Sequence, residues 1–251
     1  DFCLSRGLGD VYKRQAVMSI LGYDPFKYHT GRGPLEALGS GITIRDGDLA
    51  LRCNFATIGP DNQIVDRRVN ISPEEGMRLS QTVNEQVKLK QHPADFELRN
   101  TVIYRCVLVI KSRAGPLSGQ ISNTDLQYVR VKGLGVAVSN ADLVLKECKP
   151  LEASDAARNA ARLVNEFVRE SHRVLDRHPI NEERVKKGKP SANVILTRDA
   201  GSVLPRLPKM SERFHHSFAC LAEMPVEKGI AMAAGMSLVD LPAPGGDIKV
   251  D

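Results

Sequence analysis

The sequence predicts an α/β protein in which a partial doubly wound sheet is interrupted by an inserted α+β segment. The last quarter of the chain carries two compact apolar strand patterns, SANVILTRD at 191–199 and FACLAEM at 218–224. The second leads through Pro225 into a helical pattern, VEKGIAMAAGM, and strand–turn–helix units of this kind are typical of parallel, doubly wound sheets. Residues 46–189 instead carry an alternating strand, a hairpin and capped helices, which indicates an α+β segment.

The chain begins with residues that show no structural period. DFCLSRGLGDVYKRQ, residues 1–15, leads into the next helix without a recognisable cap. It resembles the adapter-derived peptides translated at the ends of metagenomic assemblies. We therefore expect residues 1–15 to be a non-native leader and exclude them from functional reasoning.

A basic glycine loop and a short helix follow. Asp24 and Pro25 favour a turn, because Asp bonds its own backbone and Pro fixes φ. Gly31-Arg32-Gly33 then places a guanidinium between two flexible residues. PLEAL at 34–38 predicts a helix, which the glycines of the following GSG end because they accept a left-handed conformation.

The next strand carries polar residues where a structural strand needs none. LALRCNFAT at 49–57 alternates apolar and polar side chains, as a half-buried strand does. Arg52 and Asn54 are two residues apart, so both project from one face. This face is a candidate for binding a polar ligand.

A hairpin is predicted directly after this strand. Gly59–Asn62 has the composition of a turn, and QIVDRR at 63–68 can pair with the strand before it. The pairing would bring a second polar group to the same region, consisting of Asp66, Arg67 and Arg68.

Two helices have clear start signals. Ser72 and Glu75, with a proline between them, form a capping box that opens a helix running to about residue 90. Ser154 opens the longest helix, whose apolar residues recur at three- and four-residue spacing. It is expected to end before His178, because the proline that follows disfavours helix there.

The most β-prone run is TVIYRCVLVI at 101–110, which predicts one strand with Arg105 in its middle. An arginine at such a position either extends its charged end to solvent from an exposed face or contacts an acidic ligand. Both interpretations remain open from the pattern alone.

Composition restricts the function classes. The chain has 251 residues, 42% of them hydrophobic, and a net charge of +5. Its basic residues are dispersed and aromatics make up 5%, so no nucleic-acid partner is predicted. A mild basic excess suits an anionic small molecule equally well.

No apolar run reaches the roughly 18 residues that cross a bilayer, and no signal-peptide pattern occurs, so we expect no membrane association and a cytoplasmic location. The oligomeric state is unknown.

The five cysteines are scattered and form no CxxC pair. Three of them lie inside apolar strand patterns, where a reduced, buried thiol is favoured over metal ligation.

Several blocks together resemble one enzyme family. They are SILGYDPFKYHTGRGPLEALGSGI, LALRCNFATI, VDRR, FVRESHRVLDRHPINEER, SANVILTRDAG and PVEKGIAMAAGM, and they span about residues 16–246. In this order they resemble the archaeal-type, 2,3-bisphosphoglycerate-independent phosphoglycerate mutases of the alkaline phosphatase superfamily. ISNTDL at 121–126 matches the family's Ser-Asp-Thr-Asp-Pro in Ser122, Thr124 and Asp125 and departs from it at the other two positions.

The resemblance implies a discontinuous architecture. Residues 16–45 and 190–251 would form part of an alkaline-phosphatase-like α/β core, and residues 46–189 would form the inserted α+β domain that closes over the substrate. The implied reaction interconverts 3-phosphoglycerate and 2-phosphoglycerate through a phosphoserine, at a site with two divalent metal ions, manganese or magnesium, and without 2,3-bisphosphoglycerate. Closure between two domains suits such a reaction because it shields the phosphoenzyme from water.

The family's catalytic groups are not found in this sequence. Lys13 stands where the family has its nucleophilic serine, and the Asp and His motifs that bind the metals have no counterpart. We therefore expect the chain to be an internal fragment of the enzyme, and we assign it no catalytic or metal-binding residue. We also expect it to bind no metal by itself and to be inactive alone.

Substrate-binding residues can still be nominated. Guanidinium groups bind carboxylate and phosphate through paired, charge-assisted hydrogen bonds. The candidates are Arg52, Asn54, Asp66, Arg67, Arg68 and Arg105. For each arginine, a solvated or salt-bridged side chain is the alternative. Two other functions remain open: another phosphotransferase or phosphohydrolase of the same superfamily, or a ligand-binding module without activity.

Overall fold

The structure is a computed structural model that describes residues 9–28, 30–125, 127–131, 134–137 and 143–239. The helices are α1 (Gly9–Ile20), α2 (Arg32–Gly39), α3 (Pro73–Gln86), α4 (Asp155–Asp176), α5 (Pro179–Lys186), α6 (Met210–Phe214) and α7 (Pro225–Ala233), with a 3-10 turn at Pro60–Asn62. The strands are β1 (Leu49–Ile58), β2 (Ile64–Asp66), β3 (Ala94–Val102), β4 (Arg105–Ser112), β5 (Tyr128–Val131), β6 (Leu134–Ala137), β7 (Val194–Gly201), β8 (Ala219–Cys220) and β9 (Ser237–Leu238).

The main sheet is antiparallel and is centred on β1. Strand β4 pairs with one edge of β1, while β2 and β7 share the other edge, and β3 forms the outer strand beside β4. The predicted hairpin is confirmed by the β1–β2 pairing of Thr57 with Asp66. All ten residues of β1 are buried, as expected for a strand with neighbours on both edges and helices on both faces.

The pairing of strand β7 differs from its prediction. The sequence pattern placed SANVILTRD in a parallel sheet of the phosphatase-type core, but β7 pairs antiparallel with β1, with Arg52 opposite Arg198. A continuous apolar run shows that a strand is buried and carries no information about its partner. The division into a core (16–45, 190–251) and an inserted domain (46–189) stays a prediction, although β7 belongs to the sheet of the inserted segment.

The run at 101–110 also differs from its prediction. It contains a tight turn, so Arg105 begins β4 and does not lie in mid-strand. Ile103 adopts a positive φ of 51° in this turn, and the Asn100 Nδ2 group donates to the carbonyl oxygens of Ile103 and Arg105. The turn escaped sequence analysis because it contains neither Gly nor Pro.

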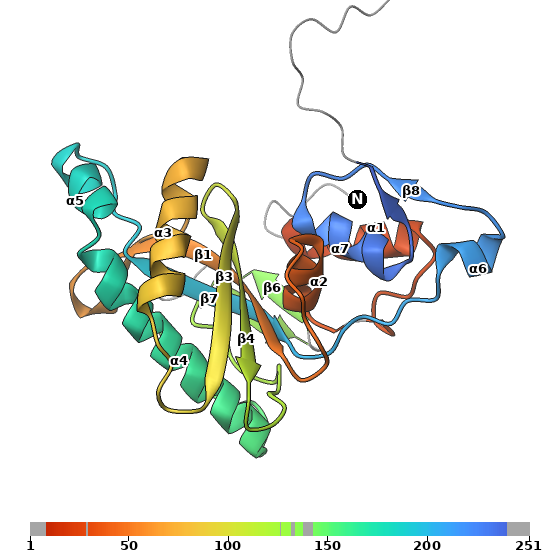
Figure 1. Cartoon of the computed structure of the whole chain (residues 1–251), viewed down its shortest axis with the longest axis horizontal. Coiled ribbons are helices and arrows are strands. Elements are labelled where there is room, and N and C mark those ends of the chain that lie inside the picture. The colour runs from red at the N-terminus through yellow and green to blue at the C-terminus, as the bar shows by residue number, and fades with distance from the viewer. Residues whose placement is uncertain (1–8, 29, 126, 132–133, 138–142, 240–251) are drawn as a thin grey trace, which may run out of the picture.

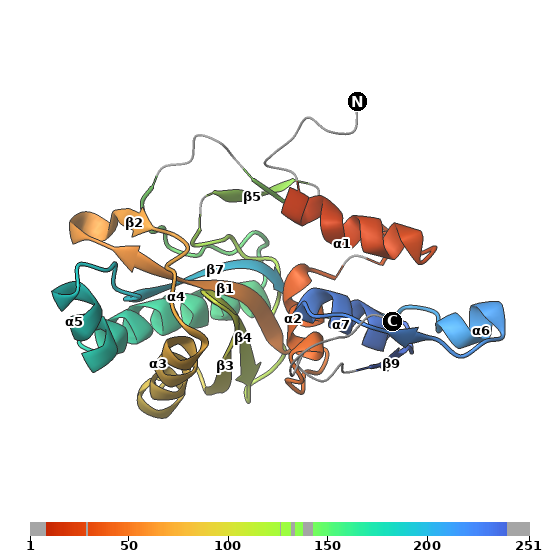
Figure 2. The ribbon, with the colours of Figure 1, turned by 90° about the horizontal axis from the view of Figure 1, so that it is seen from above.

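The two faces of β1 have different environments. Leu49, Leu51, Cys53 and Phe55 face the main core, which includes Phe167 of α4. The intervening residues Ala50, Arg52 and Asn54 project from the other face, toward α2. Figure 2 shows α3 and α4 toward one side of the sheet and α2 with α7 on the other.

Helices α3 and α4 start as predicted. Ser72 and Glu75 form both hydrogen bonds of the capping box, and the Ser154 hydroxyl accepts from the Ala157 N–H at 3.1 Å. The buried residues of α4 match the predicted apolar face, including Val164 and Leu175. None of the described helices has the length and apolarity that a bilayer crossing requires.

A second group of elements contains α1, α2, α6, α7, β8 and β9 (Figure 1). Strands β8 and β9 are parallel and are joined through α7, so the strand–turn–helix pattern from residue 218 onward is confirmed. With the antiparallel main sheet, this unit makes the described chain a mixed α/β structure, the class that the sequence predicts.

Helix α2 lies between α7 and the main sheet. A Cβ atom on Gly33 would collide with the carbonyl oxygen of Ala50 in β1, and one on Gly39 would collide with the carbonyl oxygen of Pro225 in α7. Both glycines are therefore required by close backbone approach, one on each side of the helix. These contacts fix the position of α2 against β1.

His178 caps α5 and provides a test of the fold. Its Nδ1 atom accepts from the Ile180 N–H at 3.1 Å, and its Nε2 atom lies 3.1 Å from the Thr82 hydroxyl. Burial, followed by the charge of Arg78, lowers the pKa of His178 below the usual value of 6.5.

We predict that this capping histidine makes the protein less stable in mild acid. The unfolded chain takes up the His178 proton as pH falls below 6.5, before the native state does, so stability is lost there and is fully present above that pH. His178→Asn keeps a capping acceptor without a titrating ring. Thermal unfolding between pH 7.5 and 5.5 should fall less steeply for His178→Asn than for the wild type, and equal slopes would contradict the assignment.

Candidate functional site

A cluster of arginines is buried on the α2-facing side of the sheet. Arg52 from β1 and Arg198 from β7 lie opposite each other in register, and each is 2% exposed. Asn54, two residues along β1, is 1% exposed. We use the name arginine cluster for Arg32, Arg52, Arg67 and Arg198.

Asp125 joins two members of the cluster. Its Oδ2 atom lies 3.0 Å from Arg198 Nη1, and its Oδ1 atom forms an ion pair with Arg67 Nη2. The carboxylate is 1% exposed. Because desolvated charges need close partners, this shared ion pair is what allows the two guanidinium groups to lie so deep.

The position of Asp125 is set by the preceding residue. The Thr124 hydroxyl accepts from the Thr197 N–H at 2.8 Å, and the Thr124 N–H donates to the Thr197 carbonyl oxygen at 3.0 Å. Both bonds attach the loop to β7 one residue before Arg198. Asp125 is thereby held beside the arginine that it neutralises.

Asn54 connects the cluster to the hairpin. Its side-chain oxygen accepts from Arg198 Nη2 at 3.3 Å, and its Nδ2 group donates to the carbonyl oxygen of Arg67 at 3.4 Å. The amide therefore contacts β7 and the segment after β2 at once, which explains an asparagine in a fully buried strand.

Strand β7 is irregular next to the cluster. The register shifts between the Arg52–Arg198 and Ala50–Gly201 pairs, and Asp199, at the shift, has a positive φ of 55°. The Asn123 side-chain oxygen accepts from the Asp199 N–H at 3.2 Å and stabilises this conformation. Bulges with a left-handed residue often redirect side chains beside functional sites. Here the bulge leaves the Asp199 carboxylate 3.9 Å from Arg198 Nε.

Glu36 joins the other two arginines. Its Oε1 atom lies 2.7 Å from Arg32 Nε, in the first turn of α2, and 3.6 Å from Arg52 Nε. The second distance is too long for a hydrogen bond. The Nε atom of Arg52 is buried and has no hydrogen-bond partner within the described part of the chain.

Arg52 is consequently an unusual arginine. Burial first, and then the charges of Arg198 and Arg32, lower its pKa to about 9, while Glu36 and Asp199 act in the opposite direction. The guanidinium is still charged at neutral pH. A buried cation that repels its neighbours and lacks a hydrogen bond at Nε is suited to receive an anion.

Three of the six nominated residues lie together in this site: Arg52, Asn54 and Arg67. Arg68 is exposed, and the Asp66 carboxylate accepts from its N–H at 2.9 Å, which closes the turn after β2. Arg105 lies opposite Asn54 in register on β4. Its guanidinium, however, is near Met224 and over the Tyr104 ring.

Arg198, Asp125 and Glu36 complete the site and were not nominated from the sequence. Arg198 follows directly after the apolar run VILT, and a charged residue next to a buried apolar run is the signal that could have found it. The family match at Asp125 was a second signal. Nothing in the sequence indicates that Glu36 of PLEAL points at Arg52.

The described residues do not fit the divalent metal ions that the family resemblance implies. Within the described ranges, no three His, Cys, Asp or Glu side chains gather as a ligand set. The carboxylates of the cluster are each in contact with guanidinium groups.

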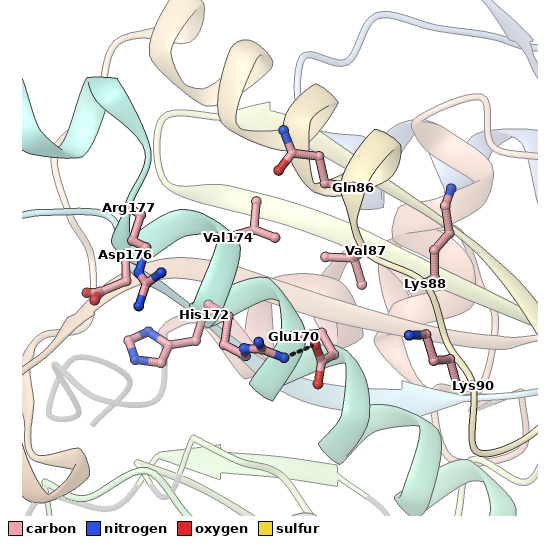
Figure 3. A pocket seen from close by; sticks show the side chains of 10 residues that line it. Gln86, Val87, Lys88, Lys90, Glu170, His172, Val174, Asp176 and Arg177 are labelled. Atoms are coloured by element: carbon pink, nitrogen blue, oxygen red, sulfur yellow. Dashed lines mark hydrogen bonds and ion pairs between the residues drawn. The ribbon is translucent and has the colours of Figure 1, made fainter.

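A hollow lies on the opposite side of the sheet from the arginine cluster, between the end of α3 and α4 (Figure 3). It has a volume of about 540 Å³ and is lined by ten residues, among them Lys88, Lys90, Arg177, Glu170 and Asp176. These side chains are of mixed charge and come from the exposed surface. The hollow lacks the buried, converging cations of the arginine cluster.

Comparison with known proteins assigns the chain to one family. A family model described as 2,3-bisphosphoglycerate-independent phosphoglycerate mutase matches residues 14–181. The chain belongs to this family. The mutase of Aeropyrum pernix is 43% identical over 226 residues, which cover 88% of this chain and 53% of that protein. The mutase of Methanopyrus kandleri is also 43% identical, over 89% of this chain and 50% of its own length.

Solved structures agree with this family assignment. The chain is similar to the cofactor-independent phosphoglycerate mutase of Thermoplasma acidophilum, with a TM-score of 0.63 and 33% identity over 92% of this chain and 57% of that one. A protein from Pyrococcus horikoshii has a TM-score of 0.60 at 27% identity, over 90% of this chain and 46% of its own. The chain spans about half the length of the curated mutases that it matches.

Asp125 should be the main stabilising residue of the site. Asp125→Asn removes the carboxylate that Arg198 and Arg67 share, and removing one partner of a buried pair costs about 3–5 kcal/mol. We expect a loss of this size in the free energy of unfolding, measured by urea denaturation.

The matched control is Asp95→Asn. Asp95 pairs with Arg113 at the exposed end of the β3–β4 hairpin, and such pairs contribute less than about 1 kcal/mol. Equal losses for the two variants would show that the cluster is not the stabilising feature we describe.

Proposed function

We propose that the arginine cluster binds the acidic groups of phosphoglycerate in a protein that interconverts 3-phosphoglycerate and 2-phosphoglycerate. The observation that carries the proposal is Arg52, a buried guanidinium whose Nε atom has no hydrogen-bond partner among the residues that the structure describes. The family of the chain supplies the reaction class. A doubly acidic ligand of this size matches several guanidinium groups on one surface better than a neutral ligand does.

The proposed roles follow from position. Arg52 would form charge-assisted hydrogen bonds to one acidic group of the ligand, and Asn54 and Asp125 would hold Arg198 and Arg67 in place. Three further residues lie outside the arginine cluster, and we propose that they also contact the substrate: Asp66, Arg68 and Arg105. The chain itself would bind and orient the ligand and exclude water from it.

The phosphoserine chemistry belongs to the complete enzyme in this proposal. The position of the family's nucleophile is Lys13, which offers no hydroxyl to carry a phosphoryl group. The four cysteines among the described residues are free thiols, which fits the cytoplasmic location that we propose.

We expect the 251-residue chain alone to show no mutase activity. Without a nucleophile, positioning of the substrate would leave only a weak rate enhancement. An enzyme-coupled assay for 2-phosphoglycerate, with added Mn²⁺ or Mg²⁺, measures this directly. Metal-dependent conversion above that of a mock preparation would overturn the expectation.

Ligand binding can be tested separately from activity. Arg52→Met keeps most of the side-chain volume and removes the charge, so the fold should persist. A charge-assisted hydrogen bond contributes roughly 1.5–3 kcal/mol, and we therefore expect the Kd for 3-phosphoglycerate to rise about tenfold or more. Isothermal titration calorimetry measures the change.

Arg113→Met is the matched control for this experiment. Arg113 is an exposed arginine near the open end of the β3–β4 hairpin, and its loss should leave the Kd unchanged. Binding by the wild type that Arg52→Met does not weaken would exclude Arg52 from the site and sink the proposal.

A further inference from the structure

Glu36 places a carboxylate beside Arg52, the guanidinium that the proposed function assigns to the anionic ligand. The residue is 2% exposed, and its Oε1 atom is shared between Arg32 Nε at 2.7 Å and Arg52 Nε at 3.6 Å. A single carboxylate oxygen thus faces two guanidinium groups. Its hydrogen bond goes to Arg32, and Arg52 receives only the longer electrostatic contact.

The packing of α2 keeps Glu36 at this distance. Gly33 and Gly39 bring the helix into backbone contact with β1 and with α7, so the helix has no room to move toward Arg52. A Cβ atom on Gly229 of α7 would likewise collide with the carbonyl oxygen of Leu35, the residue before Glu36. The backbone contacts therefore fix the position of the Glu36 Cα atom, and the hydrogen bond to Arg32 holds its carboxylate 3.6 Å from Arg52 Nε.

The charges show what this separation does. Arg52 is buried beside Arg198 and Arg32, both of which repel it, and Glu36 offsets part of this repulsion without forming a hydrogen bond. A ligand carboxylate or phosphate would meet Arg52 in a site that already contains a carboxylate. The two anions would compete for the same cation.

We propose that Glu36 is a positioning residue that acts as a built-in counter-ion of Arg52: it keeps the empty site charged and ordered and weakens its affinity for an anionic ligand. The inference rests on the proposed function, because it requires that the arginine cluster bind an anion. Glu36 thereby lowers the affinity for the ligand and stabilises the site in its absence, because burying an arginine without a carboxylate nearby would cost folding free energy.

The proposal predicts two opposite effects of one substitution. Glu36→Gln removes the internal anion, so the protein without ligand should be less stable than the wild type. The same change removes the competitor, so inorganic phosphate and 3-phosphoglycerate should bind about tenfold more tightly at pH 7. An ordinary structural carboxylate predicts the first effect without the second.

The pH dependence gives an independent measurement. Glu36 opposes the fall in the pKa of Arg52 to about 9, so its removal lowers that pKa further. Arg52 is charged only below its pKa. Phosphate binding by Glu36→Gln should therefore fade at a lower alkaline pH than binding by the wild type.

The experiment uses isothermal titration calorimetry and thermal unfolding of the 251-residue chain, with inorganic phosphate and then 3-phosphoglycerate as the probes. Glu75→Gln is the control, because it also removes a carboxylate from a close arginine partner, Arg184, which is not a member of the cluster. It should lower the thermal midpoint and leave phosphate affinity at the wild-type value. Glu36→Asp draws the carboxylate back by one methylene and should increase affinity less than Glu36→Gln, which provides a test if Glu36→Gln does not fold.

Three outcomes separate the proposals. Tighter binding by Glu36→Gln, with a larger phosphate-induced rise in thermal midpoint, supports the role of Glu36. Unchanged or weaker binding by both Glu36 variants, with wild-type binding that depends on Arg52, overturns this role and leaves the proposed function intact. Absence of binding in the wild type and in both Glu36 variants overturns both.

Discussion

The buried ion pairs between arginines of the sheet and carboxylates of neighbouring segments are the constraint on which this site depends. Arg52 and Arg198 lie where an antiparallel sheet would ordinarily carry apolar side chains, and each is 2% exposed. Asp125 neutralises Arg198 directly, while Glu36 reaches only the vicinity of Arg52. Arg198 therefore has a carboxylate within hydrogen-bond distance, whereas the carboxylate nearest to Arg52 lies beyond that distance. In the proposed function, this difference makes Arg52 the arginine that binds the ligand.

The backbone arrangement follows from the need to bring these groups together. Asp125 lies beside Arg198 because Thr124 forms hydrogen bonds with the Thr197 main chain. Glu36 lies near Arg52 because glycines let α2 pack closely against β1. Neither contact depends on the arginines themselves. The site is therefore assembled by main-chain packing, and the charged side chains meet because the segments that carry them are held in place.

The sequence predicted the parts of this arrangement that depend on local patterns. Alternation placed Arg52 and Asn54 on one face, and turn residues joined β1 to β2, which brought Arg67 within reach of Asn54. The pairing of β7 with β1 was not predictable, because an apolar run such as VILT fits any buried strand. For the same reason Arg198 was missed. Glu36 was missed because the rotation of a short helix about its axis is set by tertiary contacts.

The most direct test is to observe the Arg52 guanidinium while ligand is added. The Nε–H signals of ¹⁵N-labelled arginines can be followed by NMR during titration with 3-phosphoglycerate, with the Arg52→Met variant used to assign the Arg52 signal. If the cluster is the phosphoglycerate site, the Arg52 signal should shift and its exchange with water should slow, while exposed Arg113 stays unchanged. An Arg52 signal that does not respond to a ligand that the chain demonstrably binds would contradict the assignment.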